Sequence, residues 1–129
     1  MVLAADLEKL AHQHLADAEA LLAAGRYDGG VHLCGYAVEV ALKARICKTL
    51  GWADFPDAGH QYRSFLVHDL DVLLHLSGRE QHIRTALSSE WSDVVSWDPE
   101  VRYRPPGHAT QPDLGQMIES ARKIMGELI

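Results

Sequence analysis

The stretch from Tyr27 to Leu50 constrains the fold of this chain most, because it combines helical spacing with apolar residues on more than one side. One apolar row has steps of three and four and consists of Val31, Cys34, Val38, Leu42 and Ile46. A second row lies on another side and consists of Leu33, Ala37, Val40, Ala44 and Cys47. A helix that is apolar over so wide an arc is packed by neighbours on several sides. We therefore predict a central helix here, and we attribute its glycines, Gly29, Gly30 and Gly35, to close helix packing or to a late helix start.

Other segments also have the spacing of helices. The first carries an apolar face before Gly25, where a helix stop is expected; this face consists of Leu3, Leu7, Leu10, Ala18, Leu21 and Leu22. A short helix is predicted from about His68 to Leu76, and a longer one from the capping-box spacing at 77–80 to about Trp97. The last helix begins near 110–113 and has an apolar face up to Leu128. The fold class predicted for residues 1–129 is all-α: an up-and-down bundle of four long helices plus a short one, in a single domain.

The composition narrows the class of function. Hydrophobic residues make up 47% of the chain and charged residues 23%, which is typical of a globular domain. The net charge of −6 argues against a protein that coats duplex DNA, since such binding needs a basic surface. We expect no membrane span and no signal segment, and hence a cytoplasmic protein. Cys34 and Cys47 are interpreted as buried thiols, and the scattered histidines give no metal or cofactor motif.

A charged pair lies within the central segment. Glu39 and Lys43 are four residues apart, the spacing at which a helix brings a carboxylate and an ammonium group together. Charge on a mostly apolar helix is costly unless it is paired. The pair is either a partly exposed surface pair or part of a cleft in which it orients site residues. A nearby polar group, His68-Asp69, is interpreted as a helix cap in which Asp69 accepts from free amides.

The Pro/Gly-rich stretch from Trp97 to His108 contains the largest group of side chains suited to binding or catalysis. Arg102 and Arg104 are suited to binding phosphate through paired hydrogen bonds, and Tyr103 offers a ring on which a base can stack. His108 is the residue type best suited to proton transfer near neutral pH. The stretch is either an ordinary surface loop or an anion or nucleotide site on a rigid bundle. We expect Arg102 and the Glu39–Lys43 pair to share one water-accessible hollow.

These features occur in a characteristic order. The motif Ala-Gly-Arg-Tyr-Asp-Gly-Gly at 24–30 leads into Tyr-Ala-Val-Glu-Val-Ala-Leu-Lys-Ala at 36–44. His-Asp-Leu at 68–70, Trp97 and Arg-Tyr at 102–103 follow before a final helix. This succession resembles the HEPN family over residues 10–128. The resemblance implies a helical bundle that forms a homodimer and is associated with nucleotides or RNA.

The resemblance also implies partners and an activity. Many HEPN proteins belong to toxin–antitoxin systems together with a minimal nucleotidyltransferase, and we expect this chain to be such a nucleotide- or RNA-binding module through Glu39, Lys43, Arg102, Tyr103 and Arg104. Ribonuclease members carry an arginine, four to six residues and then a histidine, a spacing that Arg102 and His108 satisfy. The first alternative is therefore a metal-independent endoribonuclease with Arg102 and His108 as catalytic residues. However, Arg-Tyr is typical of members paired with nucleotidyltransferases. A non-catalytic dimeric scaffold is the second alternative.

Overall fold

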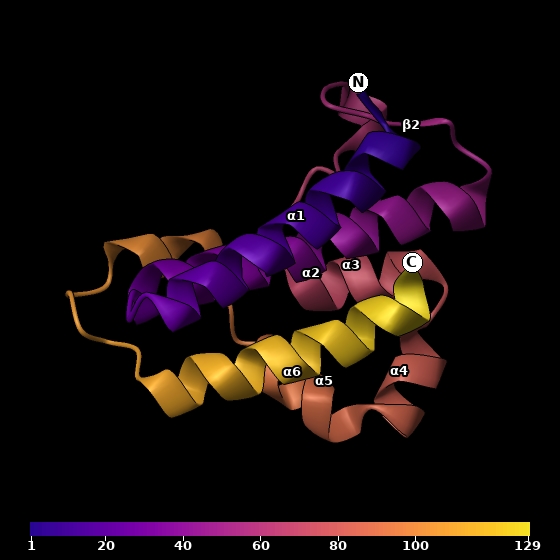
Figure 1. Cartoon of the computed structure of the whole chain (residues 1–129). Coiled ribbons are helices and arrows are strands. Elements are labelled where there is room, and N and C mark those ends of the chain that lie inside the picture. The colour runs from indigo at the N-terminus through magenta and orange to yellow at the C-terminus, as the bar shows by residue number, and fades with distance from the viewer.

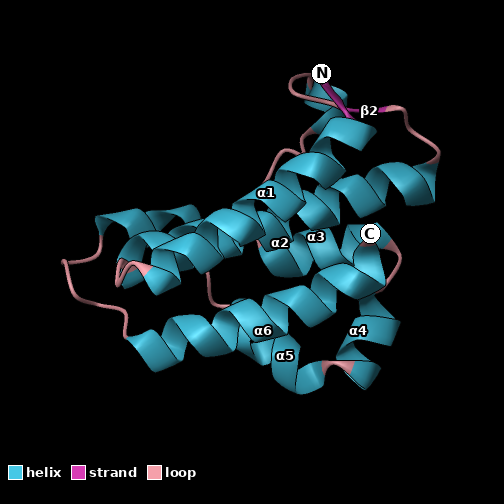
Figure 2. Ribbon diagram, viewed as in Figure 1, coloured by secondary structure: helices cyan, strands magenta, loops and turns pink.

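The computed structural model describes residues 1–129, and it is mostly helical (Figures 1 and 2). Three helices are long: α1 (Ala4–Ala23), α2 (Tyr27–Leu50) and α6 (Gln111–Leu128). Three are short: α3 (Leu70–Ser77), α4 (Glu80–Ala86) and α5 (Ser88–Val94). The 3-10 turns η1 (His60–Tyr62) and η2 (Pro99–Tyr103) lie in the connections. The all-α class is confirmed, apart from two short strands.

Those strands, β1 (Val2–Leu3) and β2 (Asp54–Phe55), pair in antiparallel register, with Val2 opposite Phe55. The sequence between Gly51 and Ser64 gave no sign of this pairing, because two residues per strand are too few to produce an alternating pattern. The pairing of β1 with β2 connects the beginning of the chain to the segment that follows α2. None of the helices combines the length and the apolar character that crossing a membrane requires.

Helix α2 occupies the centre of the molecule, as its wide apolar arc predicted. It packs against α1, α3, α6 and η2. α1 and α2 run antiparallel, joined by a turn in which Gly25 has a φ of +74°, and α6 passes along their other side (Figure 1). Half of the α2 residues are buried, including every residue from 37 to 42. The predicted bounds of α2 are confirmed.

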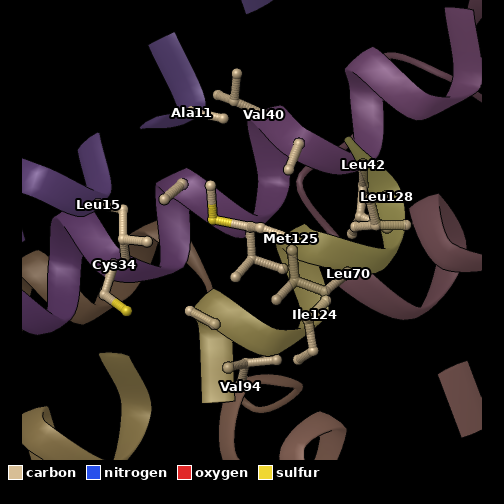
Figure 3. Packing of buried hydrophobic residues seen from close by; sticks show 14 of the residues in the cluster. Ala11, Leu15, Cys34, Val40, Leu42, Leu70, Val94, Ile124, Met125 and Leu128 are labelled. Atoms are coloured by element: carbon tan, nitrogen blue, oxygen red, sulfur yellow. The ribbon is translucent and has the colours of Figure 1, made fainter. Parts of the chain in front are cut away.

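The core is one cluster of 29 buried hydrophobic residues drawn from all six helices. Figure 3 shows its centre, where side chains of α2 meet α1 on one side and α3, α5 and α6 on the other. The labelled residues of this region are Ala11, Leu15, Cys34, Val40, Leu42, Leu70, Val94, Ile124, Met125 and Leu128. Both cysteines are free and buried, as expected.

Two glycines of α2 allow neighbouring side chains to lie directly on its backbone. A Cβ atom at Gly30 would collide with Leu114 of α6, and one at Gly35 would fall within the indole ring of Trp97. Close packing is thus the reason for glycine at these two positions. Gly29 has more room, since its Cβ would be 3.6 Å from Leu21.

The predicted fourth long helix is wrong: its residues form α4 and α5, of seven residues each. The break lies at Leu87, whose φ of −129° and ψ of 38° are not helical. Two serines follow Leu87, and serine favours helix ends over helix interiors. The break also lets α4 pack beside α3 while α5 packs on α6.

The capping box expected at 77–80 is not formed, although a helix does begin at Glu80. Ser77 instead closes α3: its hydroxyl donates to the Leu74 carbonyl and accepts from the Arg79 amide. The helix start predicted near 110–113 is confirmed, and the structure forms a capping box there between Thr110 and Asp113. The prediction of Asp69 as the cap of α3 is also confirmed.

Candidate functional site

The turn η2 places the predicted phosphate-binding residues on the surface. Asp98 caps the turn by accepting from the Glu100 amide at 2.7 Å, and the side chain of Val101 is buried in the core. With Val101 anchored, Arg102, Tyr103 and Arg104 are left exposed, and Tyr103 is 69% exposed. The guanidinium carbon of Arg102 lies 4.8 Å from the centre of the Tyr103 ring. Two cations and a stackable ring are therefore exposed at consecutive positions. The turn that carries them lies at the end of the molecule where α2 begins (Figure 1).

A carboxylate of α2 holds the far end of this loop. Asp28 accepts hydrogen bonds from the Gly107 amide at 2.7 Å and from the Ala109 amide at 3.0 Å. These bonds, with a smaller contribution from the charge of His108, lower the pKa of Asp28 below its usual 3.8. The Nε2 atom of His108 lies 3.6 Å from Asp28 Oδ1. Asp28 is thus the positioning residue of the loop. The sequence did not single it out, because its partners lie about 80 positions away.

A cavity of about 500 Å³ opens beside the loop, between the start of α2, the end of α5 and the first turns of α6. Arg104 and His108 both line it, and its apolar wall includes Val31, Val101 and Met117. Its other lining residues are Asp93, Ser96, Trp97, Ala109, Pro112, Asp113 and Gln116. Neither Arg102 nor Tyr103 lines this cavity. His108 thus shares this cavity with Arg104, while Arg102, whose spacing to His108 matched the family pattern, lies outside its lining.

The Glu39–Lys43 pair lies elsewhere on α2 and has its own partners. Lys43 Nζ is 3.2 Å from Glu39 Oε2, and His68 Nδ1 is 2.9 Å from Glu39 Oε1. The Glu39 side chain is only 4% exposed, so these two contacts compensate its loss of water. Lys43 Nζ also lies 5.5 Å above the centre of the Phe55 ring. The pair is therefore partly exposed through Lys43, while its carboxylate is buried, and the exposed His68 is a second partner of that carboxylate.

This pair does not line the cavity beside the loop, nor does Arg102. Glu39 comes eleven positions after Asp28, which corresponds to about 16 Å along the axis of α2. The common hollow expected for Arg102 and the Glu39–Lys43 pair is not this cavity. Within the molecule, no group of three or more histidine, cysteine, aspartate or glutamate side chains is arranged to hold a metal ion.

Comparison of the chain with protein-family models, with curated proteins and with solved structures found no match.

Proposed function

We propose that this chain is a HEPN-type module that binds a nucleotide or single-stranded RNA and works as a homodimer with a minimal nucleotidyltransferase in a toxin–antitoxin-type system of the cytoplasm. The observation that carries the proposal is the adjacent exposure of Arg102, Tyr103 and Arg104 on one anchored turn. Arginine donates paired hydrogen bonds to phosphate, while a tyrosine ring stacks on any base. Because the net charge is −6, this local basic patch suits a nucleotide or a short single strand better than duplex DNA.

The test is the salt dependence of RNA binding, measured by fluorescence anisotropy with a labelled single-stranded RNA. Each phosphate contact to a single strand contributes about 0.7 to the slope of log K against log salt. The double variant Arg102→Ala/Arg104→Ala should bind more weakly, with a slope smaller by about 1.4. The control variant Arg63→Ala/Arg122→Ala removes the same charge from other surfaces and should keep the wild-type slope.

Equal slopes for the two double variants, or no binding of RNA and nucleotide by the wild-type chain, would contradict the assignment. The partner is tested by co-expression with a small nucleotidyltransferase and purification through a tag on one of the two chains. Light scattering on the eluted material reports whether this chain is present as a pair. A monomer at all concentrations would remove the dimer from the proposal.

A metal-independent endoribonuclease is the second candidate, and the contact between His108 and Asp28 favours it. A carboxylate beside an imidazole holds the ring in one orientation, which suits a group that transfers a proton. In this reaction the ribose 2′-oxygen attacks the adjacent phosphorus and the bond from phosphorus to the 5′-oxygen breaks. His108 takes the proton of the 2′-OH and delivers it to the departing 5′-oxygen, while Arg102 stabilises charge on the phosphate oxygens. Incubation of RNA with purified protein and EDTA tests it. Cleavage that persists in His108→Ala would remove this residue from the mechanism, and a wild-type chain with neither cleavage nor binding would leave only a scaffold role.

A further inference from the structure

The cavity beside the loop contains a carboxylate that is held through only one of its oxygens. Asp93 of α5 lines this cavity, and its Oδ2 atom accepts hydrogen bonds from Gln116 Nε2 at 3.1 Å and from Ser120 Oγ at 2.6 Å. Both donors belong to α6, and Ser120 is buried. The other oxygen, Oδ1, accepts no hydrogen bond from the chain. Two contacts therefore fix this side chain, and one acceptor is left for a ligand.

The same cavity also contains a cation without an acidic partner. Arg104 lines it from the segment that follows η2, and its guanidinium takes part in no ion pair. His108 lines it as well, with Nε2 3.6 Å from Asp28. A second carboxylate of the lining, Asp113, caps α6 by accepting from the Thr110 amide at 3.2 Å. The cavity therefore offers an acceptor from α5 and donors from the loop.

The apolar part of the lining is anchored in the core. Trp97, Val101 and Met117 all line the cavity and are all buried, so packing on their other sides holds them in place. The volume of about 500 Å³ lies within the range of roughly 300–1,000 Å³ that is usual for small-molecule sites. Such sites are mostly apolar and have a few polar groups that fix the orientation of the ligand. This cavity thus fits a flat ring with polar groups at its edge.

We infer that the cavity binds the base of a guanine nucleotide and that Asp93 determines which base is bound. An ionised carboxylate accepts hydrogen bonds and donates none. Guanine carries two adjacent donors, N1–H and the 2-amino group, that can face the free Oδ1 atom. In adenine and cytosine a ring nitrogen acceptor lies beside the amino group, and in uracil two carbonyl groups flank N3–H. A carboxylate would face the lone pairs of these acceptors, which is unfavourable.

The inference rests on the proposed function, in which Arg104 already binds phosphate, and adds which base accompanies that phosphate. Arg104 lines the cavity and can donate paired hydrogen bonds to the phosphate while the base lies against the apolar wall. The guanine belongs either to a free nucleotide or to a single strand of RNA, and both present the same edge to Asp93.

Calorimetric titration of the wild-type chain with GMP, inosine monophosphate and AMP tests the base. Inosine monophosphate differs from GMP only in lacking the 2-amino group. GMP should bind at least about tenfold more tightly than either, the effect of one hydrogen bond to a charged acceptor. Equal affinities for GMP and inosine monophosphate would overturn the inference. Fluorescence anisotropy with a short oligouridylate, with and without one internal guanosine, then separates the sources: a gain from that guanosine assigns the site to a strand, and equal binding assigns it to the free nucleotide.

The variant Asp93→Asn gives a test that loss of folding cannot imitate. Because Gln116 and Ser120 both donate to the same oxygen, the amide oxygen of the variant keeps that position and the amide nitrogen replaces Oδ1. The cavity then offers a donor, which matches xanthosine monophosphate, whose base has a carbonyl group at position 2. The variant should bind xanthosine monophosphate about tenfold more tightly than the wild type does and GMP about tenfold more weakly. The control Asp17→Asn removes an exposed carboxylate of α1 outside the cavity and should keep the preference for GMP.

The outcomes separate this inference from the proposed function. If GMP, inosine monophosphate and AMP bind equally and Arg104→Ala weakens all three, the proposed function stands and the preference for guanine is refuted. If the wild type binds neither nucleotides nor RNA, both are removed. Unchanged affinities for GMP and xanthosine monophosphate in Asp93→Asn would overturn the role of Asp93.

Discussion

Replacing Gly35 by alanine tests whether the packing of α2 supports the functional loop. The Cβ atom added by Gly35→Ala would occupy the space of the Trp97 indole. Trp97 is 5% exposed and lies two residues before the turn η2 that carries Arg102. The indole cannot stay where it is, because the nearest atoms belong to its rigid ring system and not to a flexible end. The substitution should therefore displace Trp97 and, with it, the start of the loop.

The expected magnitude follows from two opposing effects. Alanine is about 1 kcal/mol better than glycine inside a helix, which favours the variant. Displacing a buried tryptophan forfeits most of its packing, and the loss of such a side chain costs about 3–5 kcal/mol. The net expectation is a free energy of unfolding lower by about 2–4 kcal/mol. For a chain of this size that corresponds to a decrease in Tm of roughly 6–16 °C.

Thermal unfolding followed by circular dichroism at 222 nm measures this effect. The matched control is Gly115→Ala in α6, where an added Cβ has no atom within 4 Å. This control should gain up to about 1 kcal/mol, because only the helix propensity changes there. If Gly35→Ala is as stable as Gly115→Ala, the close packing of the Trp97 indole against the α2 backbone at Gly35 is refuted. The near-UV signal of tryptophan should also change in Gly35→Ala and not in the control.

Three further predictions concern groups with unusual surroundings. Lys43→Ala should lower the free energy of unfolding in urea by about 3 kcal/mol, because it leaves the buried Glu39 carboxylate without its ammonium partner; a loss below about 1 kcal/mol would contradict the burial of that charge. Burial raises the pKa of the Cys34 thiol to about 12, so iodoacetamide at pH 8 should alkylate it in urea but not in the folded chain. The hydrogen bonds from the Gly107 and Ala109 amides lower the pKa of Asp28 in the folded chain. Their contribution to stability is therefore fully present above pH 3.8 and is lost as the pH falls through the lower pKa of the folded state. The NMR signal of the Gly107 amide should therefore move in acid, and Asp28→Asn should abolish that movement.

The long helices could be predicted from the sequence because their signals are local. The apolar rows of α2 and the capping box at Thr110 each lie within a few residues, and the structure has both. The break at Leu87 could not be predicted in this way. It depends on α4 and α5 packing on different partners, which is a property of the assembled core. The strand pair Val2–Phe55 likewise joins residues that no short window contains.

Among the candidate site residues, too, those with a local signal could be predicted and those that depend on distant contacts could not. Arg102, Tyr103 and Arg104 could be found because cations and an aromatic ring in a Pro/Gly-rich stretch stand out by composition. Asp28 could not, since an isolated acid on a helix carries no signal until its distant neighbours are known. The spacing between Arg102 and His108 is part of the resemblance to the HEPN family, which stays a prediction. That spacing carries no information about the cavity, which His108 lines together with Arg104.

The central place of α2 has a consequence for synthesis of the chain on the ribosome. The side of α2 that α6 covers is apolar, and α6 begins about 60 residues after α2 ends. At the usual speed of translation, about 5–20 residues per second, that side stays uncovered for roughly 3–12 s. During this interval the apolar side of α2 is exposed to solvent on the nascent chain. A chaperone, or a second copy of this chain, can bind that side before α6 covers it.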